Sequence, residues 1–207
     1  FLVRELSAKT AFIFLIVVTV TPLMALGATL MTIDPLSVLF WTAAMAAGWR
    51  ASQPEGTTRQ WLWVGLWMGL GFLSKYTNLA QLVSWVVFFA LWAPARKHLR
   101  RPGPYLALLI NAVCTLPVII WNAQHGWITV EHVAGGGGLY EKRALTARYL
   151  FEFVGAEFAL LNPVFFIGAV WAAIAFWRLG RRQPLQLYFF SMGAPLCLGY
   201  LALSLHS

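Results

Sequence analysis

Charged residues are scarce in this sequence. Only 11% of its 207 residues are charged, whereas 60% are hydrophobic. A soluble globular domain carries about 25% charged residues. Of the charged residues the acidic ones are the rarer: there are seven, and Asp34 is the single aspartate. This composition excludes an ordinary soluble domain and predicts an integral membrane protein.

The sequence also lacks two further patterns: the alternation of apolar and polar residues, and paired cysteines. The hydrophobic residues form long unbroken runs, whereas the strands of a membrane barrel would alternate apolar and polar residues. Backbone groups in lipid must pair within their own segment, so each run is expected to be a helix. The two cysteines, Cys114 and Cys197, lie inside apolar runs without disulfide or metal-site spacing.

The excess of basic over acidic residues needs a separate explanation. The net charge is +8, which in a soluble protein would suggest a nucleic-acid partner. Here the basic residues cluster at the ends of the apolar runs, where the positive-inside bias places them. We therefore expect membrane lipids as partners, and no nucleic acid.

Seven membrane spans are expected. Several runs are shorter than the ~20 residues of a full crossing, so the true helices should extend into the flanking polar residues. The expected spans are residues 10–31, 35–49, 60–73, 79–92, 104–121, 158–177 and 187–205.

The loops indicate orientation. Four basic groups should face the cytoplasm, which places the N-terminus inside. Asp34, Lys75 and the loop of residues 122–144 then all emerge on the non-cytoplasmic side. The basic groups are Arg4 with Lys9, Arg50 with Arg59, residues 96–101 and residues 178–182.

One segment is expected to lie on the outer surface. Residues 145–157 have a helical pattern but include Arg148, Glu152 and Glu157, and three charges in lipid would be costly. We predict an amphipathic surface helix there. The fold expected is thus an all-α polytopic bundle forming a single transmembrane domain over residues 1–207. Residues 122–157 form an outer loop and interfacial helix within it.

Asp34 and Lys75 are the leading candidate functional residues. Asp34 precedes Pro35 at the start of a run, so it suits both a helix cap and a carboxylate at the rim of a site. Lys75 suits both a snorkelling lysine and a cation that holds a lipid phosphate. The residues alone leave both pairs of interpretations open.

The outer loop offers weaker candidates. Asn122 and His125 could hydrogen-bond a sugar or a phosphate. Glu131 and His132 are possible loop contacts, but together with His125 they match no zinc motif, so no metal site is expected. Further possible contacts follow the glycine run of residues 135–138, at Lys142 and Arg143.

Three short motifs carry a family resemblance. They are Thr32-Ile33-Asp34-Pro35-Leu36, Gly71-Phe72-Leu73-Ser74-Lys75-Tyr76-Thr77 and Trp121-Asn122-Ala123-Gln124-His125-Gly126-Trp127. In order and spacing the chain resembles the family-39-type polyprenyl-phosphate-sugar glycosyltransferases, whose superfamily includes protein mannosyltransferases and the aminoarabinose transferase of lipid A.

The resemblance implies a GT-C architecture with its active site on the outer face. Such a glycosyltransferase of the cell envelope takes a sugar from a polyprenyl-phosphate donor and passes it to an acceptor, which is a lipid, glycan or protein. By analogy Lys75 would contact the carrier phosphate, Asp34 would lie beside the donor, and Asn122 and His125 would line the cavity. The expected location is the bacterial inner membrane, and no divalent metal is expected as a cofactor.

One departure from the family pattern matters. Family members carry their main acidic motif in the first outer loop, and no matching Asp-Glu pair occurs in this chain. The catalytic residues are therefore unknown, and the base is expected outside an internal fragment that is inactive by itself. Two alternatives remain: a polytopic transporter, which predicts charges within the spans, and a non-catalytic membrane subunit, for which Asp34 and Lys75 would be dispensable.

Overall fold

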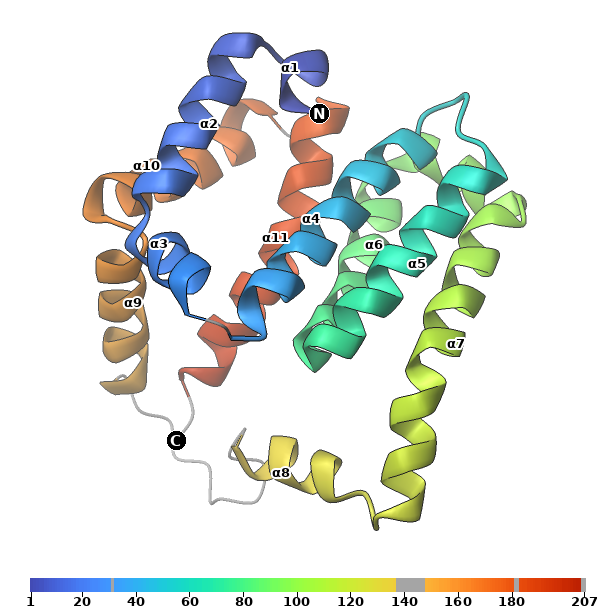
Figure 1. The fold of residues 1–207 in the computed structure, drawn as a ribbon. Helices are drawn as coiled ribbons and strands as arrows, with labels where there is room; N and C mark the ends of the chain where they lie inside the picture. Colours follow the sequence, from blue (N-terminus) through green and yellow to red (C-terminus); the bar gives the residue numbers. More distant parts are fainter. Residues whose placement is uncertain (31, 137–147, 181–182, 206–207) are drawn as a thin grey trace.

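The computed structural model describes residues 1–30, 32–136, 148–180 and 183–205. Within these ranges every regular element is helical, so the prediction of an all-α protein is confirmed (Figure 1). The elements are α1 (Leu2–Glu5), α2 (Ala8–Val20), α3 (Pro22–Thr29), α4 (Asp34–Ala51), α5 (Thr58–Ser74), η1 (Tyr76–Leu79), α6 (Ala80–Leu91), η2 (Ala93–Arg100), α7 (Gly103–Gln124), α8 (Ile128–Gly136), α9 (Arg148–Leu160), α10 (Pro163–Ala175), η3 (Phe176–Gly180) and α11 (Pro184–Leu203).

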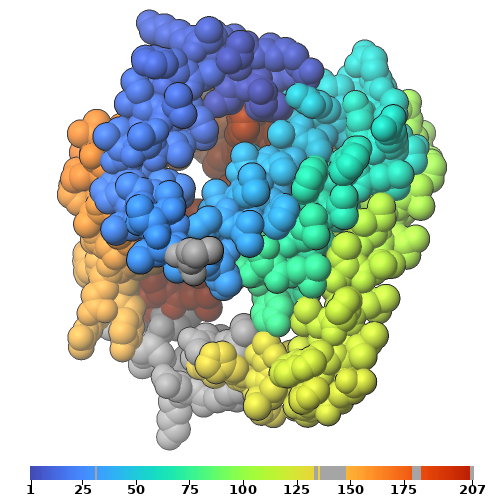
Figure 2. Space-filling model, in the orientation of Figure 1, coloured from blue at the N-terminus to red at the C-terminus, as the bar shows by residue number. Residues whose placement is uncertain are grey.

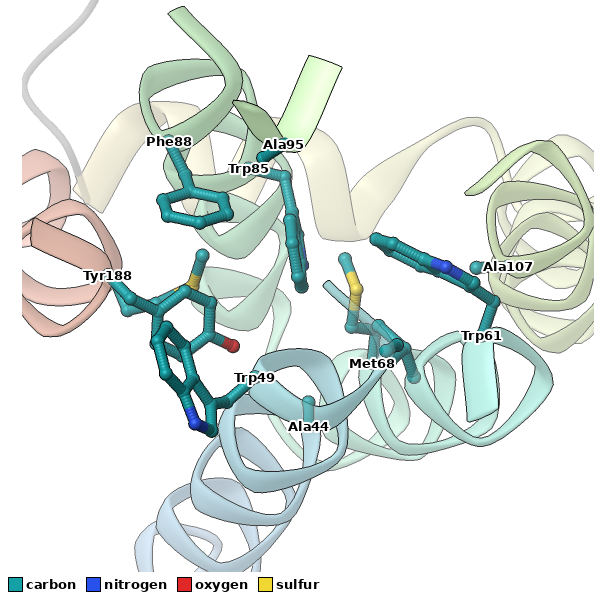
Figure 3. Packing of buried hydrophobic residues seen from close by; sticks show 12 residues of the cluster. Ala44, Trp49, Trp61, Met68, Trp85, Phe88, Ala95, Ala107 and Tyr188 are labelled. Atoms are coloured by element: carbon teal, nitrogen blue, oxygen red, sulfur yellow. The ribbon is translucent and has the colours of Figure 1, made fainter. Parts of the chain in front are cut away.

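An aromatic core joins the central helices. α5 packs against both α4 and α7, while α6 packs against α11. Trp85 of α6 lies at the centre, with its ring centroid 5.1 Å from that of Trp61 and 5.8 Å from that of Tyr188 (Figure 3). Tyr188 is fully buried and donates a hydrogen bond to the Met45 carbonyl oxygen at 2.8 Å, so the phenol is satisfied where no water reaches it.

Small residues allow α5 and α7 to approach closely. A Cβ at Gly65 would collide with the Ala107 backbone, and one at Gly69 would collide with the Cys114 side chain. The two glycines are four residues apart and so lie on one helix face. This spacing of small residues is typical of helix contacts in membranes, where close backbone approach stabilises the pair.

The peripheral helices pack less tightly. The space-filling view shows open gaps between α3 and α4, and between α8 and the end of α5 (Figure 2). Large apolar side chains remain exposed along α2, α7 and α10, including Phe12, Val113 and Trp171. Apolar surface on this scale fits contact with lipid or with further protein.

Among the residues that the structure describes, two helices, α7 and α11, are long and apolar enough to cross a membrane by themselves. Three bent pairs meet the same test only when each is taken as one broken span: α2 with α3, η1–α6 with η2, and α9 with α10 continued to Arg178. The structure therefore supports two to five spans by length and composition. The seven predicted spans stay a prediction.

Two of the predicted spans contain a sharp bend that was not predicted. The span predicted at residues 10–31 bends by 67° between α2 and α3, because Pro22 lacks an N–H group and begins a new helix. The span predicted at residues 158–177 begins inside α9 and crosses a 113° bend. Asn162 causes this second break, because its backbone φ of +72° is not helical. Its side chain caps the new helix, which begins at Pro163: Asn162 Oδ1 accepts the Val164 N–H at 3.0 Å.

The predicted surface helix is partly described. Residues 148–157 belong to α9, whereas residues 145–147 lie outside the described ranges. Arg148 and Glu152 form an exposed ion pair of 2.9 Å at (i, i+4) spacing, so these charges lie outside the packed core. Whether α9 lies on a membrane surface stays a prediction.

The bundle has two chemically different ends. α4 and α6 run in the same direction, while α5 runs antiparallel to both (Figure 1). The start of α4, the end of α5, the end of α7 and α8 gather at one end, called here the rim end. The residues that follow α4 lie at the opposite end with η2. This second end is called the basic end, because η2 carries Arg96, Lys97 and Arg100.

Candidate functional site

The rim end brings Asp34 and Lys75 together. Lys75 follows the last residue of α5 in an extended conformation, and its N–H donates to the Gly71 carbonyl oxygen at 2.9 Å. The chain turns there into η1. Lys75 Nζ lies 2.5 Å from Asp34 Oδ1 in the first turn of α4. Two residues 41 positions apart in the sequence thus form an ion pair, called here the rim pair.

Asp34 does not act as a side-chain cap. The residue at the cap position of α4 is Ile33, and no side chain caps this helix start. The Asp34 carboxylate instead accepts the Lys75 ammonium. That hydrogen bond, together with the charge of Lys75, lowers the pKa of Asp34 below its usual value despite some loss of solvation. Asp34 is therefore ionised at neutral pH.

The rim pair is accessible. The Lys75 side chain is 37% exposed and that of Asp34 is 55% exposed. Exposed ion pairs contribute about 0–1 kcal/mol to stability, so stability alone is a weak reason for this arrangement. The Lys75 ammonium has three donors and the carboxylate engages one of them. Two N–H groups can therefore meet another anion from the solvent side.

A buried polar ladder lies beneath the rim pair. Ser37 Oγ donates to Asn78 Oδ1 at 2.9 Å, and Asn78 Nδ2 donates to the Ser37 carbonyl oxygen at 3.2 Å. Gln81 Nε2 then donates to the Trp41 carbonyl oxygen at 3.2 Å. All three polar side chains are at least nine-tenths buried. The polar ladder fixes α4 against η1 and α6, and so fixes where Asp34 meets Lys75.

Asn122 and His125 lie at the corner between α7 and α8. Asn122 is 3% exposed and both ends of its amide are engaged: Nδ2 donates to the Val118 carbonyl oxygen at 2.9 Å, and Oδ1 accepts the Thr129 N–H at 3.2 Å. His125 Nδ1 lies 2.7 Å from the Trp121 carbonyl oxygen, and its ring stacks on Trp121 with centroids 4.2 Å apart. The two residues shape this corner, and their predicted contact with substrate stays a prediction.

The remaining loop candidates are Glu131, His132, Lys142 and Arg143. Glu131 and His132 are exposed on α8, and their predicted contacts are untested. Lys142 and Arg143 lie outside the described residues. Within the described ranges no three His, Cys, Asp or Glu side chains gather in a way that could hold a metal ion. The expectation of a metal-free site therefore stays a prediction.

An apolar cavity opens at Tyr76, the residue that follows Lys75. It measures about 320 Å³ and lies between the start of α6, with η1, and the last turns of α11. Such a cavity suits a hydrocarbon chain rather than a sugar. Its lining includes Tyr76, Thr77, Ala80, Pro195, Gly199 and Tyr200.

The polar ladder is the part of the site that sequence reasoning missed. A signal was present, because Asn78, Gln81 and Ser84 are spaced three residues apart inside an otherwise apolar run. Polar side chains at this spacing share one helix face. Within a membrane segment such a face is expected to meet polar partners on a neighbouring helix.

Comparison with known proteins gives one family. A family model described as dolichyl-phosphate-mannose-protein mannosyltransferase matches residues 1–121, which include the rim pair and the polar ladder. No solved structure matches the chain at a significant level.

Three curated relatives share partial similarity. A lipid A galacturonosyltransferase, RgtD, from Rhizobium johnstonii is 27% identical over 86% of this chain and 36% of its own length. The undecaprenyl phosphate-alpha-4-amino-4-deoxy-L-arabinose arabinosyl transferase of Erwinia tasmaniensis is 33% identical over 49% of the chain and 20% of its own length. Its counterpart from Edwardsiella ictaluri is 30% identical, with 63% of the chain and 25% of the relative covered. The chain thus spans about a third or less of the length of these relatives.

Proposed function

Because the chain belongs to the dolichyl-phosphate-mannose-protein mannosyltransferase family, we propose that it forms part of a membrane glycosyltransferase. This enzyme moves a sugar from a polyprenyl-phosphate donor to an acceptor on the non-cytoplasmic face of the bacterial inner membrane. The acceptor is a lipid, a glycan or a protein. The names of the relatives, which refer to lipid A and to undecaprenyl phosphate, favour a lipid acceptor and an undecaprenyl carrier.

The rim pair is the observation that carries the proposal. A lone lysine on the non-cytoplasmic side runs against the positive-inside bias, and this one is held in place by Asp34 at 2.5 Å. Breaking the bond between sugar and phosphate leaves negative charge on the departing phosphate. A fixed ammonium beside that phosphate stabilises the charge as it develops.

Asp34 has a positioning role in this scheme. Its carboxylate orients the Lys75 side chain, which carries several rotatable bonds and would otherwise sample many rotamers. An incoming phosphate binds the two remaining N–H groups of Lys75. Asp34 thus holds the ammonium in position before the donor binds. Once the donor is bound, the ammonium contacts both the Asp34 carboxylate and the phosphate.

The adjacent cavity gives the donor a place for its tail. The cavity borders Tyr76, the residue after Lys75, and is lined mainly by apolar groups of α6 and α11. A polyprenyl chain in this cavity would leave its phosphate at Lys75. Asn122 and His125, at the same end of the bundle (Figure 1), are proposed to approach the sugar from the α7–α8 corner.

The test measures sugar transfer by the membrane protein that carries this chain, in nanodiscs with a radiolabelled polyprenyl-phosphate sugar. Lys75→Ala should lower kcat/KM by about 100-fold or more, by analogy with the loss of one group that stabilises charge in the transition state. Asp34→Asn should give a smaller loss, because it removes the partner that positions Lys75 while leaving the ammonium. Lys9→Ala, an exposed lysine at the opposite end, is the matched control and should retain native turnover.

The outcomes separate the alternatives. Equal turnover in the native protein and in folded Lys75→Ala would contradict the role of Lys75 and favour a non-catalytic subunit. Movement of the labelled donor across the nanodisc or vesicle membrane, with its sugar intact, would instead favour the transporter.

A further inference from the structure

A second cavity lies at the basic end, away from the rim pair. It measures about 390 Å³ and sits where the end of α4, η2 and the first residue of α11 meet. The cavity is separated from Asp34 by the length of α4. Its polar lining consists of Ser52, Gln53, Lys97, His98 and Arg101, and its aromatic lining of Trp49, Phe88 and Trp92.

His98, one of the residues that line this cavity, has a buried ring nitrogen without a partner. The residue is 4% exposed, and its Nδ1 atom has no hydrogen-bond partner. Interaction with the backbone of Ser52 and Gln53 partly offsets the effect of burial on the pKa of the imidazole, and Nδ1 is the ring nitrogen that lacks a partner. A buried polar atom without a partner is unfavourable, so a ligand that satisfies it gains a specific contact.

The cations beside His98 are also available. Within the described ranges Lys97 and Arg101 form no ion pair, and the one side-chain hydrogen bond of Arg101 is a 3.5 Å contact to the Gly56 carbonyl oxygen. Arg96 differs, because it donates to the carbonyl oxygens of Phe89 and Ala90 at the end of α6. Arg96 thus completes a helix end, while Lys97 and Arg101 face the cavity.

The nearby carboxylate of Glu5 is already engaged. It accepts from Trp49 Nε1 at 2.9 Å and pairs with Arg4 at 2.7 Å. Trp49 therefore offers its ring, and not its N–H group, to the cavity. The charged side chains that line the cavity itself, Lys97 and Arg101, are both cations.

We propose that this cavity binds a phosphate group that carries, or lies next to, a hydroxyl group. Lys97 and Arg101 hold the phosphate charge, and His98 Nδ1 accepts a hydrogen bond from the hydroxyl. Hydrogen phosphate from solution and the headgroup of phosphatidylglycerol both have this chemistry. The site lies at the opposite end from the rim pair and does not depend on the proposed transferase.

The state of His98 supports an acceptor role. Burial, together with the charge of Arg101, lowers the pKa of His98 below its usual value. The ring is therefore neutral at pH 7, and neutral Nδ1 accepts a hydrogen bond when the other nitrogen carries the proton. An anion without a hydroxyl would leave this acceptor unsatisfied. Phosphate should therefore bind better than sulfate, and phosphatidylglycerol better than phosphatidylmethanol.

The experiment compares the ligands within each pair: phosphate with sulfate, and phosphatidylglycerol with phosphatidylmethanol. Phosphate and sulfate are titrated calorimetrically against the protein in phosphatidylcholine nanodiscs. Native mass spectrometry then measures how much phosphatidylglycerol or phosphatidylmethanol the protein retains. Binding of phosphate places the source in solution, whereas retention of phosphatidylglycerol without phosphate binding places it in the membrane. Each result supports the site.

Variants of the cavity provide the second arm. Lys97→Gln and Arg101→Gln should each weaken binding about fivefold, as expected for one cation near an anionic headgroup. Arg100→Gln, on the same helix but outside the cavity lining, should change binding less than twofold. His98→Phe should remove the preference within each ligand pair and keep the binding due to charge.

Three results would overturn the proposal. One is that the native protein binds none of the four ligands. Another is that Arg100→Gln weakens binding as much as Arg101→Gln, which would indicate attraction by the whole basic surface. The third is equal binding within both ligand pairs by the native protein, which would remove the role of His98. This last comparison needs no mutation, so it holds even if His98→Phe does not fold.

Discussion

The two ends of α4 handle charge in opposite ways. At the rim end Lys75 is matched by the single aspartate of the chain, above the polar ladder. At the basic end Lys97, His98 and Arg101 surround a cavity, and the nearby carboxylate of Glu5 is engaged elsewhere. The rim end thus holds the Lys75 ammonium in position with a carboxylate. At the basic end the positive charge of Lys97 and Arg101 can be neutralised by a bound anion.

Exchanging the charges of the rim pair should have the largest effect. In Asp34→Lys with Lys75→Asp, an ion pair can still form, so thermal stability should change little. The ammonium would then start from α4, and sugar transfer should fall about 100-fold or more. Transfer assays and thermal unfolding of the same samples measure the two quantities. Recovery of transfer in the exchanged variant would show that the pair is structural only.

Asn78→Ala should have the next largest effect. The change removes both hydrogen bonds to Ser37 in the buried polar ladder. The free energy of unfolding, measured by SDS titration in mixed micelles, should fall by about 1–2 kcal/mol. Gln53→Ala at the basic end is the control, because its amide bonds only to Trp49 within its own turn; it should cost about 0.5 kcal/mol or less. Equal losses would mean that the ladder adds nothing beyond a local contact.

Acid should weaken the two ends in separate pH ranges. The pKa of His98 lies below its ordinary value of 6.5 in the folded protein, so the unfolded chain binds a proton first and stability falls as pH drops below about 6.5. The pKa of Asp34 is also lowered, from 3.8. Its contribution is complete above 3.8 and is lost as pH falls through the lower folded value.

Thermal unfolding between pH 8 and pH 2 measures both steps. His98→Phe should remove the upper step, and Asp34→Asn should remove the lower one. The lower step should be small, because the rim pair is exposed to solvent. Persistence of the upper step in His98→Phe would assign it to another group.

Gln81→Leu should have the smallest effect. Gln81 donates one hydrogen bond to the Trp41 carbonyl oxygen, but its Oε1 is buried without a partner. Replacing a half-satisfied polar group by an apolar one of similar shape is nearly neutral. The free energy of unfolding should therefore change by about 0.5 kcal/mol or less. A loss above about 2 kcal/mol would show that Oε1 has a partner, such as a bound water.

Much of the fold could be predicted from composition and from the apolar runs. The all-α class and the approximate places of the central helices follow from hydrophobicity, which is averaged over many residues. The breaks at Pro22 and at Asn162 were not predicted, since residues 10–31 and 158–177 remain apolar across them. A proline or asparagine in an apolar run is tolerated in several conformations, and packing decides among them.

The site was predictable in part. Asp34 and Lys75 could be selected because each is a rare charge at the edge of an apolar run. Their direct contact could not be predicted, because it depends on the pairing of α4 with η1 and α6 across 41 residues. Asn122 was selected as a polar group near an outer loop, yet both ends of its amide bond to nearby backbone. Spacing in a sequence does not distinguish a side chain that hydrogen-bonds to nearby backbone from one that contacts a ligand.

The polar ladder also determines how α4 and α6 are aligned along their axes. Ser37 meets Asn78 and Trp41 meets Gln81, at sequence separations of 41 and 40 residues, and Asp34 meets Lys75 at 41. The helices run in parallel, so a slip of one turn, about 5.4 Å, would break all three contacts together. The two helices can therefore move as one body but cannot slide past each other by small steps. A substitution deep in the bundle that shifts this alignment would move a surface ammonium by the same distance, and would change chemistry at the rim without touching it.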